Sequence, residues 1–207
     1  MSNRTIGKIG SAVTGIATFS FALTMIISLF RDFFFASCFV CIFLAIGFIL
    51  FMAALNSSED QTKKGCRIAA MSFASIYAVF IFIVYFAQCT TLRLNMNLSE
   101  EALSIISYRH LGSLFFNYDL LGYGFMALST FLTGLSFKAE NKGDRILRKL
   151  LMIHGIFFIS CLIIPMFPVF TESSTGYRTG VILLEIWCAY FLPICILGYK
   201  HFQGMKG

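Results

Sequence analysis

The chain has 207 residues, of which 58% are hydrophobic and only 13% are charged, and its mean hydropathy is +0.82. This composition lies far outside that of soluble globular proteins and predicts an all-α integral membrane protein with a single transmembrane domain over residues 1–207. The net charge of +6 does not indicate binding to nucleic acid, because the Lys and Arg residues lie beside the apolar segments, where they orient a membrane protein.

The first apolar segment follows a short basic N-terminus, MSNRTIGKIG, and lacks the small-residue cleavage pattern of a secretory signal peptide. We therefore expect a retained helix over about 10–30, with a removed signal peptide as the alternative. A second helix is expected over about 33–55. The two are separated only by Arg31 and Asp32, so a tight hairpin has to connect them.

The third helix is expected over about 68–89, after the polar loop sequence NSSEDQTKKGCR. Ala70, Ala74 and Ala78 form a stripe of small residues on one face of it, which permits close approach of a neighbouring helix. In the long connection that follows, Asn97 with Glu100 three residues later predicts the cap of a short helix. That helix is too short to span and is expected to lie on the membrane surface.

Three further helices complete the predicted bundle. The loop before the fifth, KAENKGDRILRK, is the most basic part of the chain, and Pro165 and Pro168 are expected to bend or end that helix near its far side. The six predicted spans cover about 10–30, 33–55, 68–89, 115–137, 150–170 and 180–197.

The distribution of basic residues predicts the orientation. The N-terminus, the 2-3 loop, the 4-5 loop and the C-terminus together hold twelve Lys and Arg residues, whereas the three connections on the other side hold four. Because cytoplasmic segments carry the excess of Lys and Arg, both termini are expected in the cytoplasm.

Two carboxylates lie at the same predicted depth. Asp119 and Glu185 each fall about five residues into a helix from the outer side, roughly 8 Å down at 1.5 Å per residue. A charged carboxylate inside a membrane costs roughly 2 to 4 kcal/mol, so it normally has a partner or faces a wet cavity. Either Arg93, Arg109 or tyrosine hydroxyls neutralise these groups and lock the helices together, or the carboxylates form the floor of an outward-open cavity.

That cavity would bind a cation, a proton or a lipid headgroup. Its expected lining residues are Asp119, Glu185, Gln88, Tyr123, Arg93 and Arg109.

The helix that contains Asp119 also shows a resemblance. The segments FAQCTTLRLN and SLFFNYDLLGYGFMALSTF, with an aspartate followed by Gly-Tyr-Gly and a Ser-Thr pair, resemble small multi-pass membrane proteins of Gram-positive bacteria that are known only as a domain of unknown function. The resemblance covers about 76–135. It implies a bacterial plasma membrane and no particular activity.

Cysteine is frequent, with seven residues, and Cys38 and Cys41 form a C-x-x-C pair on one helix face. This pair is similar to that of quinone-linked thiol oxidoreductases of the membrane. Those enzymes also need a second, exposed pair, and here only Cys89 lies near the outer surface. We therefore expect the cysteines to be small packing residues, with thiol redox chemistry as an alternative.

No other pattern indicates an enzyme. His110, His154 and His201 lack metal-ligand spacing, and the chain contains no phosphate-binding loop and no G-x-S-x-G motif, so neither a metal nor a cofactor is expected.

Three functions follow from these patterns. The first is a cavity protein, transporter-like or lipid-binding. The second is an accessory or sensory subunit that packs on a membrane-protein partner, or on a second copy of itself, through the alanine stripe. The third is a thiol oxidoreductase that uses Cys38 and Cys41. The lipid bilayer is the expected surrounding in each case.

Overall fold

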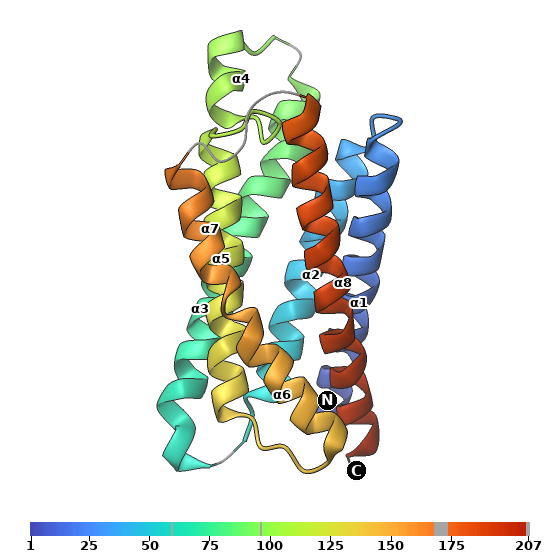
Figure 1. Cartoon of the computed structure of the whole chain (residues 1–207), viewed down its shortest axis with the longest axis vertical. Coiled ribbons are helices and arrows are strands. Elements are labelled where there is room, and N and C mark those ends of the chain that lie inside the picture. Colours follow the sequence, from blue (N-terminus) through green and yellow to red (C-terminus); the bar gives the residue numbers. More distant parts are fainter. Residues whose placement is uncertain (59, 96, 168–173, 206–207) are drawn as a thin grey trace.

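The computed structural model describes residues 1–58, 60–95, 97–167 and 174–205, and within these ranges the chain contains helices and no strands. The long helices run side by side along the longest axis of the molecule, and the two termini lie at the same end (Figure 1). The helices are α1 (Asn3–Ser28), α2 (Phe34–Leu55), α3 (Lys64–Ala87), α4 (Glu100–Ile106), α5 (Leu114–Ser136), α6 (Lys142–His154), α7 (Phe157–Met166) and α8 (Ser174–Gly204).

Five segments of the described chain are long and apolar enough to cross a membrane: Asn3–Ser28, Phe34–Leu55, Gln61–Leu92, Lys142–Met166 and Arg178–Gly204. The class of a helical protein with several membrane-length segments is therefore supported. Helix α5 is not one of the five, although it has 23 residues. Its hydropathy is lower because its buried face is partly polar, with Asp119, Ser129, Thr130, Thr133 and Ser136 all turned inward.

Helix α1 begins seven residues earlier than expected, at Asn3 rather than at residue 10. The Ser2 hydroxyl caps it by accepting a hydrogen bond from the Thr5 backbone N–H at 3.3 Å. Part of the basic N-terminus is thus a helical turn. Helix α8 also exceeds its predicted range at both ends, whereas α2 and α5 match theirs to within one residue.

The basic segment before the fifth predicted span is mostly helix, not loop. Helix α6 starts at Lys142, where the Asn141 side chain accepts a hydrogen bond from the Asp144 N–H at 2.9 Å. Its basic residues lie on the exposed and half-exposed faces, and Leu147 and Leu151 are fully buried. In an amphipathic helix of this kind the basic side chains face outward and the apolar side chains face the bundle, so a segment rich in basic residues can still be helical.

The fifth span is interrupted in its middle rather than only at its far side. Helices α6 and α7 are separated by Gly155 and Ile156, and a Cβ on Gly155 would lie 2.9 Å from the Cβ of Phe131 on α5. Pro165 lies in the last turn of α7, as expected. Pro168 and the predicted end of this span at residue 170 lie outside the described residues.

The short helix of the long connection is present as α4, at the end of the bundle opposite the termini (Figure 1). Its cap is Ser99 rather than Asn97. The Ser99 hydroxyl accepts a hydrogen bond from the Ala102 N–H at 3.2 Å.

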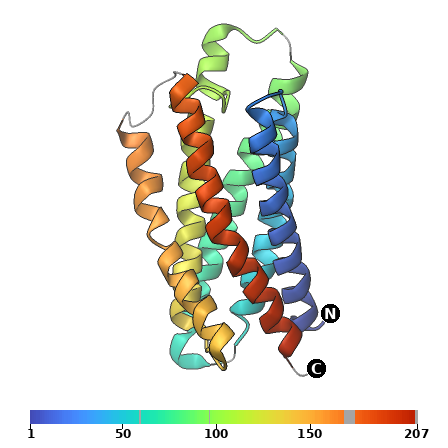
Figure 2. The same ribbon diagram turned by 45° about the vertical axis from the view of Figure 1, so that its right-hand side comes forward.

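The helices pack around α2 and α5. Helix α1 lies against α2 and α8, and α3 lies between α2 and α5. Helix α8 crosses the bundle obliquely (Figure 2), and it contacts α6 from Trp187 in its middle to His201 in its last turn. Ala70, Ala74 and Ala78 are 0–2% exposed, so the alanine stripe is buried inside the chain. That stripe therefore offers no free face to a partner subunit.

Candidate functional site

A cavity of about 700 Å³ opens at the end of the bundle opposite the termini. Its walls come from the end of α1, the start of α2, the start of α8 and the loop before α5. The lining mixes aromatic, aliphatic and polar side chains, and its phenylalanines are Phe21, Phe30, Phe34 and Phe116. Volume and lining are those of a small-molecule site, which is typically apolar with a few placed polar groups.

The polar groups deep in this cavity are Tyr85, Tyr108 and Cys38. The rings of Tyr85 and Tyr108 lie 5.9 Å apart. Behind them is Asp119, which is 3% exposed and does not line the cavity itself. The Tyr108 hydroxyl donates a hydrogen bond to Oδ2 of Asp119 at 3.2 Å. Within the described part of the chain, Oδ1 of Asp119 has no hydrogen-bond partner. One side chain thus separates the cavity from an incompletely paired carboxylate.

Gln88 positions Tyr108 rather than lining the cavity as predicted. Its Nε2 donates to the carbonyl of Ile106 at 3.1 Å, and its Oε1 accepts from the N–H of Tyr108 at 3.2 Å. Gln88 begins a π-helical turn, Gln88–Leu92, at the end of α3. Such turns are rare and often occur at functional sites. Gln88 therefore holds the loop in the place where Tyr108 reaches Asp119.

The two arginines expected beside Asp119 lie elsewhere. Arg109 donates to both carboxylate oxygens of Asp32, at 2.7 and 2.8 Å, and its guanidinium lies 4.6 Å from the centre of the Phe34 ring. Arg93 lies 4.3 Å from the ring centre of Phe35. Of the partners predicted for Asp119, a tyrosine hydroxyl is therefore the one observed.

The Arg109–Asp32 pair joins the α4–α5 connection to the α1–α2 hairpin at the rim of the cavity. The hydrogen bonds from Arg109 lower the pKa of the Asp32 carboxyl below its usual value. A lowered folded-state pKa means that the pair stabilises the fold above the unfolded-state pKa and is lost as pH falls through the folded one. Both side chains are more than half exposed, so we expect Asp32→Asn to change the unfolding free energy by less than about 1 kcal/mol at pH 7.

Thermal unfolding of both proteins between pH 7 and pH 3 measures this contribution. The difference between wild type and Asp32→Asn is expected to shrink as the pH falls below the usual range of an aspartate. A difference that grows on acidification would contradict the assigned pair.

Glu185 does not share a floor with Asp119. It is half-buried on α8, it does not line the cavity, and its Oε1 has no hydrogen-bond partner among the described residues. Helices α5 and α8 meet here through the rings of Tyr123 and Trp187, whose centres are 5.2 Å apart. Tyr123 fills this contact and makes no hydrogen bond to Asp119 in the described structure. The two predicted carboxylates therefore do not form one site.

The C-x-x-C pair lies beside the cavity. Cys38 is 1% exposed and is one of its lining residues, whereas Cys41 is completely buried. All seven cysteines are free thiols in the structure. Thiol chemistry at this pair stays a hypothesis.

Two features were missed by sequence reasoning. Tyr108 lies next to Arg109 in the connection before α5, and although a tyrosine hydroxyl was among the expected partners of Asp119, no local pattern marks this one. The second is a buried polar chain in which His154 on α6 lies between Thr130 of α5 and Trp187 of α8. His154 was considered only as a metal ligand, and the described residues contain no group of three His, Cys, Asp or Glu side chains that could hold a metal ion.

Comparison of the chain with protein-family models, with curated proteins and with solved structures finds no match. The site is therefore interpreted from its own geometry.

Proposed function

We propose that this chain is a non-enzymatic protein of the bacterial plasma membrane that crosses the bilayer six times and binds a small organic cation in its outer cavity. Helix α5 is the sixth span in this proposal. It has the 23 residues that a membrane crossing needs, and it packs between α3 and the α6–α7 pair, which are themselves membrane-length. Its polar side chains are acceptable because they face protein rather than lipid.

The proposed orientation has both termini in the cytoplasm. The twelve-to-four distribution of Lys and Arg supports it, as does the position of both termini at one end of the bundle (Figure 1). The cavity then opens outward, and α4 lies at the outer surface, where Ile105 is 57% exposed and available to the lipid interface.

The observation behind the proposed ligand is Oδ1 of Asp119, which has no hydrogen-bond partner among the described residues and lies one side chain behind a cavity that is partly aromatic. Of the three ligands expected from the sequence, a cation fits this arrangement best. A carboxylate in a low-dielectric site attracts positive charge, and aromatic faces add about 0.5 to 2 kcal/mol of cation–π attraction. Of the two arginines that line the mouth, Asp32 neutralises Arg109, whereas Arg31 adds a positive charge that an entering cation has to pass.

Binding of tetraphenylphosphonium to the detergent-purified protein, measured by isothermal titration calorimetry, tests the proposal. Asp119→Asn is expected to lower the affinity at least about tenfold, which corresponds to about 1.4 kcal/mol, while leaving the protein folded. Glu185→Gln is the matched control, since Glu185 neither lines the cavity nor has the described hydrogen bond to Tyr108 that Asp119 has, and it should bind like wild type. Neutral triphenylphosphine oxide should bind weakly to all three proteins. Equal affinity of wild type and Asp119→Asn would refute a cation site at Asp119.

A further inference from the structure

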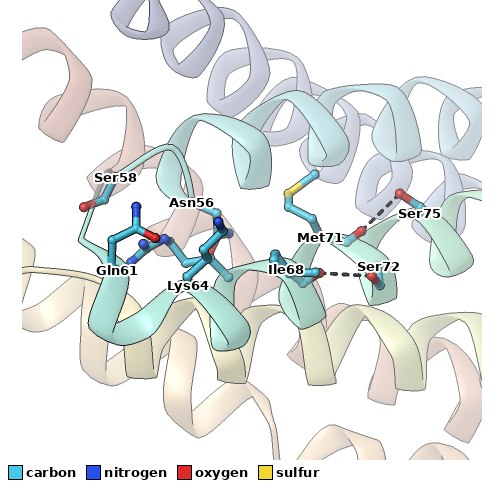
Figure 3. A pocket seen from close by; sticks show the side chains of 9 residues that line it. Asn56, Ser58, Gln61, Lys64, Ile68, Met71, Ser72 and Ser75 are labelled. Atoms are coloured by element: carbon cyan, nitrogen blue, oxygen red, sulfur yellow. Dashed lines mark hydrogen bonds between the residues drawn. The ribbon is translucent and has the colours of Figure 1, made fainter.

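A second pocket, of about 450 Å³, lies at the opposite end of the bundle, near the termini. It is bounded by the end of α2, the turn that follows it and the first half of α3. Figure 3 shows Ser58, Gln61 and Lys64 towards one end of this pocket, and Ile68 and Met71 further along α3. The pocket is thus polar at one end and mainly apolar at the other.

Arg67 is the unusual member of the polar end. It lines the pocket although it is only 6% exposed. Its Nη2 donates to the backbone carbonyl of Asp60, but its Nη1 has no hydrogen-bond partner among the described residues. A buried, charged donor without a partner is costly to the fold, which indicates that an acceptor from outside the chain completes the site.

The charge of the pocket specifies an anion. Lys64 and Arg67 both line it, and none of the described lining residues carries a carboxylate. The nearby Asp60 is turned back on its own loop, where Oδ1 accepts from the N–H and the hydroxyl of Thr62 at 2.9 and 2.7 Å. Lys64 is also the first residue of α3, so the positive end of the helix dipole adds to the field.

The apolar end extends the same surface along α3. Ile68 is 57% exposed, and Met71 is half-buried. The hydroxyls of Ser72 and Ser75 donate to the carbonyls of Ile68 and Met71 on their own helix, each at 3.0 Å (Figure 3). Their hydrogen atoms are therefore already used within the helix, and this end of the pocket behaves as mainly apolar. A ligand with a charged headgroup and an acyl chain fits the basic end and the apolar end of this pocket together, whereas a free anion would contact only the basic end.

We propose that this pocket binds an anionic phospholipid, with the headgroup phosphate between Arg67 and Lys64 and an acyl chain along Ile68 and Met71. Guanidinium and ammonium groups are the usual partners of phosphate, and basic pockets at the ends of membrane helices bind lipid headgroups. The inference relies on the proposed membrane topology only to place the lipid in the cytoplasmic leaflet. It does not depend on the outer cavity or on its ligand.

Titration calorimetry in phosphate-free buffer tests it with four probes: dihexanoyl phosphatidylglycerol, dihexanoyl phosphatidylcholine, glycerol phosphate and inorganic phosphate. Phosphatidylglycerol is expected to bind most tightly. Lys64→Gln is expected to weaken it about fivefold, the effect of one basic residue near an anionic headgroup. Lys142→Gln is the matched control, because Lys142 is exposed at the same end of the bundle and does not line the pocket.

Arg67→Gln is expected to weaken phosphatidylglycerol further than Lys64→Gln. If Arg67→Gln fails to fold, Lys64→Gln decides alone, since Lys64 is exposed. Equal binding of the two lipids, or equal effects of Lys64→Gln and Lys142→Gln, would overturn the site. Inorganic phosphate binding as tightly as the lipid would overturn the lipid assignment, because the site would then serve a soluble anion. None of these outcomes involves Asp119, so they are separable from the test of the outer cavity.

Discussion

Gly10→Leu is expected to lower the free energy of unfolding by about 3 kcal/mol or more, because α1 and α2 touch through their backbones at this residue. A Cβ on Gly10 would overlap the backbone nitrogen of Phe51 and lie 2.7 Å from the carbonyl carbon of Leu50. The contact is reciprocal, since a Cβ on Gly47 would lie 2.7 Å from the backbone nitrogen of Thr14. Backbone atoms cannot turn aside as a flexible side chain can, so the two helices would have to separate.

Thermal or denaturant unfolding in one detergent measures this effect. Gly65→Leu is the matched control, because a Cβ on Gly65, near the start of α3, meets nothing within 4 Å. It replaces a helical glycine by a better helix former and is expected to leave the stability unchanged or slightly higher. Similar losses for both variants would show that α1 and α2 do not depend on this close approach.

The sequence predicted those helices best that are bounded by polar residues on both sides. The expected spans 33–55 and 115–137 agree closely with α2 and α5. The fifth predicted span, 150–170, includes the end of α6, but residues 142–149 were expected to be loop because their apolar residues alternate with basic ones. Leu147 and Leu151 are spaced by about one helical turn, but a pattern of this kind does not produce the uniformly apolar segment that is typical of a membrane span.

The sequence predicted that Asp119 needs a polar partner, but not which side chain supplies it. Asp119 lies in an apolar segment, and in the structure its side chain is 3% exposed. Which side chain reaches it depends on how the loop before α5 folds back, and that is set by the hydrogen bonds of Gln88 to residues eighteen and twenty positions away. The equal depth predicted for Asp119 and Glu185 likewise does not make them neighbours, because position along a helix does not determine the direction in which a side chain points.

The buried polar chain at His154 ties three helices together. Trp187 Nε1 donates to Nε2 of His154 at 3.0 Å, so Nδ1 carries the proton and donates to the Thr130 hydroxyl at 2.7 Å. The Thr130 hydroxyl in turn donates to the carbonyl of Ala127 at 2.9 Å. Every hydrogen-bonding position of the imidazole is thereby used in one tautomer, in a residue that is 1% exposed.

His154→Leu is expected to cost about 2 to 4 kcal/mol of unfolding free energy, because it leaves the buried Trp187 N–H without an acceptor and removes the packing of the ring. Trp187→Phe removes that donor, so in the double variant the substitution at His154 no longer leaves an unsatisfied group. The two losses should therefore be less than additive by about 1 kcal/mol when the four proteins are compared by unfolding in one detergent. Additive losses would mean that the two side chains stabilise the bundle only through separate packing, and that the hydrogen bond between α6 and α8 contributes nothing.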